Sequence, residues 1–144
     1  MIAVRHAGIV VEDLEAMLAF YVDGLGLAVA ARADESGAFV EGLLGLPGVR
    51  VTTVKLTGDD GPTLVELLCY RHPAPPPRRP LATNTPGPTH VAFTVSGLDS
   101  LHARLAAAGI AFNAQPRLSP DGRAKVAYCR DPEGNFVELV EMMP

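Results

Sequence analysis

The sequence predicts an α+β protein built from two successive copies of one β-α-β-β-β module. Residues 5–27 and 89–110 share one order of features: a polar residue, a histidine, a short apolar strand, a polar break, an amphipathic helix and a glycine. Residues 63–70 (TLVELLCY) and 135–142 (NFVELVEM) share a Val-Glu-Leu strand. Each copy therefore opens with a histidine strand and closes with a glutamate strand.

The composition fits a compact protein and narrows its partners. Of the 144 residues, 48% are hydrophobic and 19% are charged, which is enough apolar material for a core. The net charge of −4 argues against a nucleic-acid partner, because phosphate binding needs a clustered basic surface. No apolar stretch reaches the roughly 20 residues of a membrane span, so no membrane partner is expected. We expect a small-molecule substrate instead.

The N-terminus and the two cysteines predict a cytoplasmic location. Residues 1–6 (MIAVRH) run directly into a strand pattern without the features of a signal peptide. Cys69 and Cys129 stand alone, without a Cys-x-x-Cys spacing. This usage suits a reducing compartment, with both thiols free and buried as small hydrophobic side chains.

The first helix has clear start and stop signals. Asp13 is a suitable N-cap and Gly24 a suitable end. Between them an apolar stripe recurs at helical spacing: Leu14, Met17, Leu18 and Tyr21.

The second helix is predicted in the same way. Ser96 followed by Asp99 resembles a capping box, and Gly109 ends the run. Its apolar stripe consists of Leu98, Leu101, Leu105 and Ala108.

Each copy continues with further short strands, such as residues 49–56 and 125–129. Residues 131–134 (DPEG) have the preferences of a type I turn before the final strand. The first copy is longer: 60 residues separate its histidine from its glutamate, against 48 in the second. The excess of 12 residues is expected around 35–48.

The predicted organisation is a first βαβββ module over residues 1–71, a proline-rich extended linker over 72–88 and a second βαβββ module over 89–144. The linker sequence is HPAPPPRRPLATNTPGP.

The two histidines are expected to face away from the helices. Alternate side chains of a strand share a face, and the aliphatic face of each histidine strand must cover its helix. His6 and His90 therefore point to the other side of their sheets. The residues two positions later, Gly8 and Ala92, are small and leave room beside the imidazole rings.

The two glutamates are expected to share a cation with these histidines. Glu66 and Glu138 each have apolar neighbours on their own face of the strand, and no lysine or arginine lies within three residues of either. A carboxylate in such surroundings is costly to desolvate unless a positive charge compensates it. His6, Glu66, His90 and Glu138 are therefore predicted to converge on one divalent ion (Zn, Ni, Co, Mn or Fe), with positions open for water or substrate.

Three segments carry a resemblance to a known family: HAGIVVEDLEAMLAFYVDGLGL, THVAFTVSGLDSLHARLAAAGI and DPEGNFVELVE. From His6 to Glu141 the chain resembles the vicinal oxygen chelate superfamily, which includes glyoxalase I, methylmalonyl-CoA epimerase, extradiol dioxygenases and bleomycin-resistance proteins. The resemblance implies a glyoxalase-like fold, in which the two modules form an open, cupped, barrel-like sheet around a metal, and a homodimer.

The candidate ligands favour one branch of this superfamily. The resemblance implies a His, Glu, His, Glu set for bacterial glyoxalase I, which these four positions match. Drug-binding members typically lack the ligands, and extradiol dioxygenases use two histidines and one carboxylate. Methylmalonyl-CoA epimerases usually have glutamine where this chain has Glu66. Residues 39–71 also look like a subgroup of sugar-cyclitol epimerase-like proteins.

The expected activity is metal-dependent proton transfer, an epimerisation or isomerisation of a small oxygenated substrate. Glu138 is the first candidate base, because glutamate ligands of the family can leave the metal. Glu41 is the second, since GAFVE resembles the position of the epimerase base, although an exposed loop carboxylate would look the same. A glyoxalase I-like lyase, an extradiol-type dioxygenase, a small-molecule (antibiotic) binding protein and a scaffold with a vestigial site remain alternatives.

The remaining aromatic and histidine side chains have less distinctive patterns. Tyr70, Tyr128 and Phe39 are candidates for the pocket wall or, more simply, for core packing. His72 begins the linker and His102 lies just off the apolar stripe, so neither is expected to take part in the site.

Overall fold

The structure is a computed structural model that describes residues 1–59 and 61–144. The chain divides into two compact units, Met1–Arg78 and Arg79–Pro144. The boundary falls inside the proline-rich segment 72–88. Among the helices of these described residues, none has the length and apolar character needed to cross a membrane.

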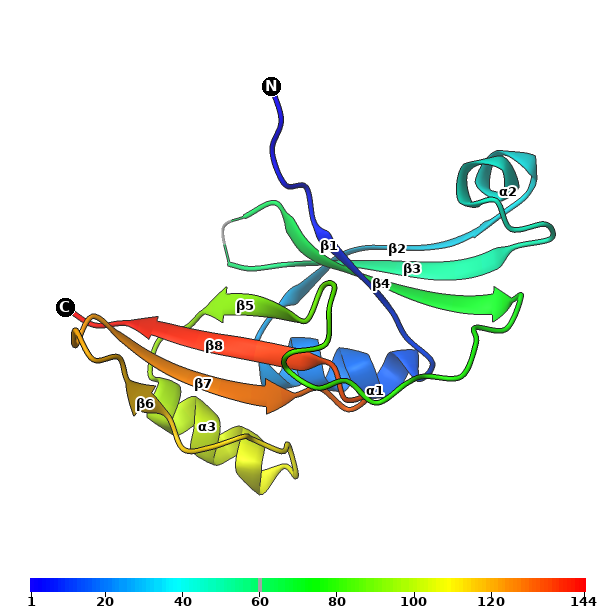
Figure 1. Ribbon diagram of the computed structural model, residues 1–144. Helices are drawn as coiled ribbons and strands as arrows, with labels where there is room; N and C mark the ends of the chain where they lie inside the picture. The colour runs from blue at the N-terminus through cyan, green and yellow to red at the C-terminus, as the bar shows by residue number, and fades with distance from the viewer. Residues whose placement is uncertain (60) are drawn as a thin grey trace. The chain divides into compact units, whose positions relative to one another are not determined.

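The first unit is a four-stranded mixed sheet with helices (Figure 1). The strand order is β1-β4-β3-β2, with β1 parallel to β4 and the other pairs antiparallel. The elements are β1 (Ala7–Val10), α1 (Leu14–Leu18), η1 (Ala19–Gly24), β2 (Ala28–Ser36), α2 (Ala38–Leu44), β3 (Arg50–Thr57) and β4 (Thr63–His72).

The second unit repeats this plan (Figure 1). Its strand order is β5-β8-β7-β6, with β5 parallel to β8. Its elements are β5 (His90–Thr94), α3 (Leu98–Ala107), β6 (Arg117–Leu118), β7 (Ala124–Arg130) and β8 (Phe136–Met142). Both units are therefore β-α-β-β-β modules, which confirms the predicted α+β class. Neither sheet is closed into a barrel over the described residues.

The first helix begins as predicted but widens in its second half. The Asp13 carboxylate accepts a hydrogen bond from the Ala16 backbone N–H at 3.0 Å, which confirms the N-cap. From Ala19 the helix continues as the π-helical segment η1. The wider turn buries both Phe20 and Tyr21, whose rings meet edge to face at 5.0 Å. A stripe drawn at ordinary helical spacing misses Phe20 for this reason.

The predicted capping box of the second helix is wrong. The N-cap of α3 is Gly97, in the left-handed conformation with φ +68°. The Glu141 carboxylate of β8 accepts hydrogen bonds from the Gly97 and Leu98 N–H groups at 2.6 and 3.1 Å. Asp99 instead contacts Lys125 Nζ at 2.6 Å. A carboxylate distant in sequence thus caps this helix, because β8 brings it to the helix start.

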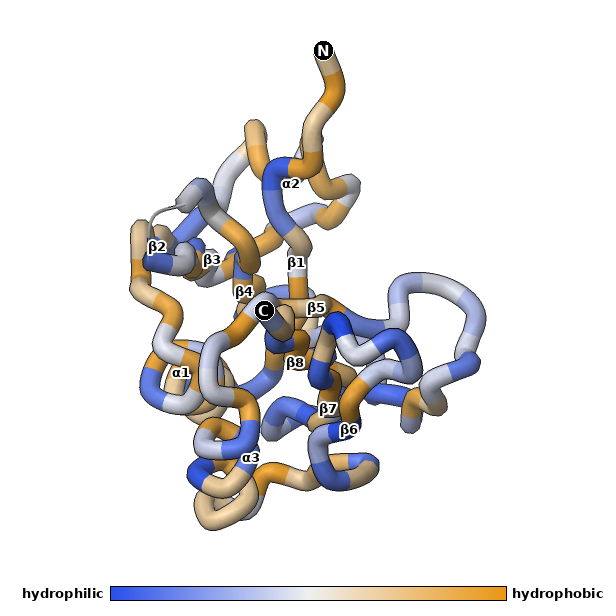
Figure 2. The backbone as a smooth tube through the Cα atoms, turned by 90° about the vertical axis from the view of Figure 1, so that its left-hand side faces the viewer, coloured by the Kyte–Doolittle hydropathy of each residue, from blue (hydrophilic) through white to orange (hydrophobic). Residues whose placement is uncertain are grey.

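The insertion of the first copy is the helix α2, between β2 and β3, as its position in the sequence predicts. Val40 is buried against Val49 and Val51, while Phe39 and Leu43 of the same helix are 80% and 70% exposed. Figure 2 shows a second exposed apolar segment, the extended N-terminal residues coloured partly orange. The insertion is therefore anchored by a few aliphatic contacts and leaves apolar surface uncovered.

The core of each unit lies between the sheet and the first helix of the module. In β4 and β8 alternate residues are buried, namely Val65, Leu67, Cys69, Val137 and Leu139. Both cysteines are buried and free, as predicted. The predicted turn before β8 is also present, with the Gly134 N–H donating to the Asp131 carbonyl at 2.9 Å. Glu66 and Glu138 lie on the other face of β4 and β8.

Candidate functional site

The parallel pairing of β1 with β4 brings His6 to Glu66. Gly8 lies directly opposite Glu66 in this pairing, and His6 is two residues before Gly8 on the same face. His6 Nε2 lies 3.0 Å from Glu66 Oε2, and both side chains are partly exposed. A Cβ at Gly8 would lie 3.3 Å from Leu68 Cδ1, so a larger residue beside this pair would require the Leu68 side chain to shift slightly.

The second unit builds the same pair from equivalent positions. Ala92 lies opposite Glu138 across β5 and β8, and His90 is two residues before Ala92. His90 Nε2 lies 3.2 Å from Glu138 Oε2. Each unit therefore presents one imidazole and one carboxylate in contact, on the sheet face that does not carry the helix.

The residue opposite each glutamate on the antiparallel side differs between the units. Lys55 of β3 pairs with Glu66, and its Nζ lies 3.9 Å from Glu66 Oε1. Tyr128 of β7 pairs with Glu138, and its hydroxyl lies 3.4 Å from His90 Nε2. Lys55 is not close to Glu66 along the chain, because it comes from the neighbouring strand. The register of the β3–β4 hairpin is the signal that predicts this contact.

Burial and hydrogen bonds determine the protonation of Tyr128 and the orientation of His90 in the second pair. Burial raises the pKa of Tyr128, and the charge of Glu138 together with a hydrogen bond to it raises this pKa further. The phenol therefore keeps its proton at neutral pH and can donate toward the carboxylate. Thr89 Oγ1 lies 2.9 Å from His90 Nδ1, which fixes the ring from its other side.

The first pair is held differently. His6 Nδ1 is buried and has no hydrogen-bond partner among the described residues. The His6 ring is therefore oriented through Nε2 and Glu66 alone, whereas the His90 ring has contacts at both nitrogens.

The donor atoms of both pairs suit a divalent cation. An ion with bonds of about 2.1 Å places neighbouring ligand atoms about 3 Å apart, which matches the nitrogen–oxygen separation in each pair. Imidazole nitrogen and carboxylate oxygen are ordinary ligands of such ions. Taken within either unit, the described residues form no group of three or more potential ligands.

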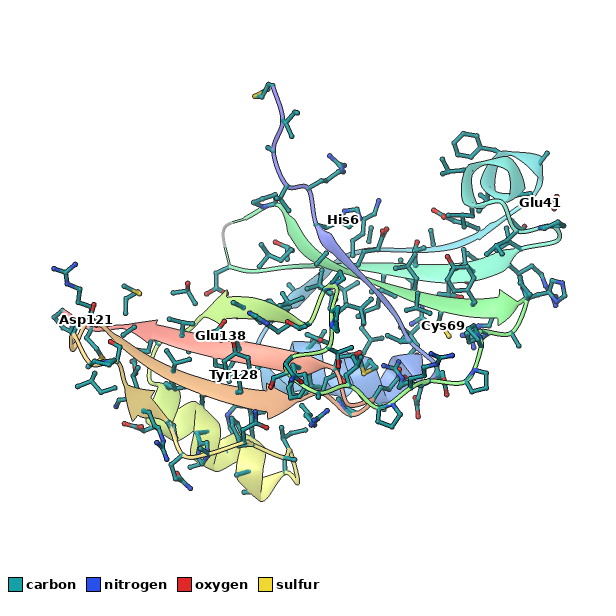
Figure 3. All side chains as sticks on the ribbon, viewed as in Figure 1. His6, Glu41, Cys69, Asp121, Tyr128 and Glu138 are labelled. Carbon is teal, nitrogen blue, oxygen red and sulfur yellow. The ribbon has the colours of Figure 1, made fainter. Side chains whose placement is uncertain are left out.

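A pocket of about 310 Å³ opens beside His90 in the second unit. Its lining consists of Thr83, Thr89, His90, Asn113, Tyr128 and Phe136. Figure 3 shows Tyr128 and Glu138 side by side on β7 and β8. Of the three aromatic candidates, Tyr128 thus lines a pocket, Tyr70 packs against the cluster under α2, and Phe39 does neither.

The other candidate residues lie elsewhere. Glu41 is on α2, at the end of the first unit's sheet remote from His6 (Figure 3). His72 is exposed at the end of β4, and His102 is buried with its ring 4.3 Å from that of Phe112. Among the described residues, neither histidine forms a His–Glu pair.

Both units have the β-α-β-β-β plan, and each carries a His–Glu pair on the sheet face that does not carry the helix. Comparison with known protein families identifies the class of protein that has these features. The family model of the Glyoxalase/Bleomycin resistance protein/Dioxygenase superfamily matches residues 3–139. The chain belongs to this superfamily, whose members commonly use a divalent metal ion. The comparison with curated protein sequences finds no match.

Solved structures agree with this assignment. A glyoxalase family protein from Bacillus cereus is 25% identical, with a TM-score of 0.92 over 100% of this chain and 96% of that one. A lactoylglutathione lyase from Agrobacterium tumefaciens is 26% identical, with a TM-score of 0.56 over 96% and 92%. The trypanothione-dependent glyoxalase I of Leishmania major is 18% identical and shares the fold, with a TM-score of 0.67 over 98% and 87%.

Proposed function

We propose that His6, Glu66, His90 and Glu138 together hold one divalent ion, and that the protein catalyses proton transfer on a small oxygenated substrate bound at that ion. The observation that carries the proposal is the repetition of one His–Glu pair, at 3.0 and 3.2 Å, at equivalent strand positions of two modules. Zn, Ni, Co, Mn and Fe all suit two imidazole nitrogens and two carboxylate oxygens. A cytoplasmic homodimer is part of the same proposal.

When bound, the ion would act as a Lewis acid that polarises a substrate oxygen and acidifies the neighbouring C–H group. Glu138 is then the first candidate for the base that takes this proton, because it contacts both His90 and Tyr128, which line the pocket. Tyr128 would orient Glu138 by donating a hydrogen bond. Protonation of the opposite face of the carbon by a second acid would give epimerisation, and return of the proton by Glu138 to a neighbouring atom would give isomerisation.

Glu41 remains the second candidate base. It lies on α2, away from His6, and none of its side-chain contacts ties it to the His6–Glu66 pair. Replacement of Glu41 by Gln with unchanged solvent-deuterium exchange would remove it from the mechanism, whereas lost exchange at full metal content would give it the role of base.

A glyoxalase I-like lyase is the second candidate function. The name of the Agrobacterium tumefaciens neighbour, a lactoylglutathione lyase at 26% identity, favours it. Such a reaction also moves a proton next to a carbonyl, so the same four residues would serve. Turnover of a thiol adduct of a 2-oxoaldehyde, with no exchange in simple hydroxyketones, would identify the lyase.

The test combines metal analysis with proton exchange. His6→Ala and His90→Ala proteins should lose bound metal and, with it, exchange of substrate C–H for deuterium measured by NMR. His72→Ala is the matched control, since His72 is an exposed histidine outside both pairs. A His90→Ala protein that retains a full equivalent of metal would refute the ligand assignment.

A further inference from the structure

The pocket beside His90 is lined mainly by residues that have polar groups in their side chains. Five of its six residues carry polar side chains, and the sixth is Phe136, whose ring supplies an apolar wall. The polar groups are the hydroxyls of Thr83, Thr89 and Tyr128, the amide of Asn113 and the imidazole of His90. Within the described part of the chain, this lining contains no lysine, arginine or carboxylate.

Two of these side chains are available to a ligand. Asn113 is held by its backbone N–H, which donates to the Tyr128 carbonyl at 2.9 Å, and both residues line the pocket. Neither the Asn113 amide nor the Thr83 hydroxyl has a hydrogen-bond partner within the described residues. An amide and a hydroxyl can each donate and accept, which suits the hydroxyl groups of a ligand.

The charged side chains nearest the pocket are already in contact with other groups of the protein. Glu138 contacts both Tyr128 and His90, and in the proposed metal site the two carboxylates offset the charge of the divalent ion. The Arg130 guanidinium lies 3.9 Å from the centre of the Phe136 ring, but it donates to the carbonyls of Gly134 and Leu81 at 2.9 and 3.2 Å. Two of the five guanidinium N–H donors are thus engaged in holding the pocket wall.

We propose that this pocket binds the neutral, hydroxyl-bearing carbon chain of the substrate, so that the substrate is a small hydroxylated ketone or aldehyde and not a carboxylate or an acyl-CoA thioester. The hydroxyls and the Asn113 amide bind the ligand hydroxyls, and Phe136 packs against its C–H face. At about 310 Å³ the pocket is at the small end of ligand sites. The substrate class rests on the proposed function; binding in the pocket does not.

The experiment titrates isotope-labelled full-length protein with two probes of equal chain length, the neutral hydroxyketone erythrulose and the anion 4-hydroxy-2-oxobutanoate. It follows the backbone amides of the pocket residues by NMR and, in proteins that retain it, the Asn113 side-chain amide. Erythrulose should shift these signals and bind about tenfold more tightly than the anion. Asn113→Leu and Tyr128→Phe should each weaken erythrulose binding by about tenfold, the effect of one lost hydrogen bond in a ligand site. Tyr70→Phe is the matched control, because Tyr70 packs in the first unit's apolar cluster.

Each outcome decides a separate claim. Erythrulose binding with these losses, but without deuterium exchange, would support the pocket and refute the proposed function. Exchange that prefers the anion, or methylmalonyl-CoA, would support proton transfer and overturn the substrate class. Erythrulose binding that neither variant weakens, or no binding at all, would overturn the pocket assignment. A folded spectrum of each variant is required, and Asn113→Asp provides a second, nearly isosteric change that should also disfavour the anion further.

Discussion

Lys55 lies opposite Glu66 across β3 and β4, with its Nζ 3.9 Å from Glu66 Oε1, and Tyr128 takes the equivalent place opposite Glu138. The two half-sites therefore differ in charge, although their His–Glu pairs are alike. An ammonium group beside Glu66 offsets the carboxylate charge and repels a divalent ion. The first pair should consequently be the weaker contributor to metal binding.

Replacing Lys55 by Met tests this difference. Removing the ammonium should tighten divalent metal binding by about 3- to 10-fold, with a smaller gain at high salt because Lys55 is partly exposed. Competition with a chromophoric chelator measures the affinity. Lys125→Met is the control, since Lys125 pairs with Asp99 away from the site and its loss should leave the affinity unchanged. Weaker metal binding in Lys55→Met would contradict the prediction.

Replacing Glu141 by Ala should destabilise the second unit by about 1–2 kcal/mol, because two N–H groups at the start of α3 lose their acceptor. Urea unfolding gives the change in free energy. Ser96→Ala is the matched control: the sequence predicts Ser96 as the cap, whereas the structure assigns the cap to Glu141, so this change should cost no more than a few tenths of a kcal/mol. A larger loss of stability in Ser96→Ala than in Glu141→Ala would instead support the capping box.

Replacing Asp131 by Ala should cost about 2–4 kcal/mol, since this buried carboxylate accepts hydrogen bonds from the Glu133 and Asn135 backbone and from the Asn135 amide. Chemical denaturation monitored by circular dichroism measures the loss. Asp121→Ala removes an exposed turn aspartate with similar local bonds, to Ser119 and Arg123, and should shift the midpoint much less. Equal shifts would show that burial of the turn carboxylate is unimportant.

Cys129 should make the folded protein less stable at alkaline pH. Burial, followed by the charge of Asp131, raises the pKa of this thiol from 9.0 to about 12. Between these values the unfolded chain releases the proton while the folded chain retains it, so stability falls as pH rises above 9, by up to about 1.4 kcal/mol per pH unit. Urea midpoints from pH 8 to 10.5 should fall less steeply for Cys129→Ala than for the unmodified protein.

Cys69→Ala is a second variant for that series, since it removes the other buried, free cysteine. Parallel pH profiles for the unmodified protein and Cys129→Ala would contradict the assignment.

The sequence by itself determined the elements and their repetition. The alternation of Val65, Glu66 and Leu67 sets which side chains face the helix, because successive residues of a strand point to opposite sides. The matching histidine strands, glutamate strands and glycines predict both modules and the place of the insertion, although not that the insertion is helical. Local rules are sufficient here, since each depends on residues close together in the chain.

Only the tertiary structure decided the contacts between distant strands. The pairing registers place Lys55 beside Glu66 and Tyr128 beside Glu138, and β8 brings Glu141 to the start of α3. An apolar stripe of fixed helical period likewise does not predict the wide turn that buries Phe20. Strand register and cross-strand neighbours depend on how the whole sheet packs, so residue spacing along the chain does not encode them directly.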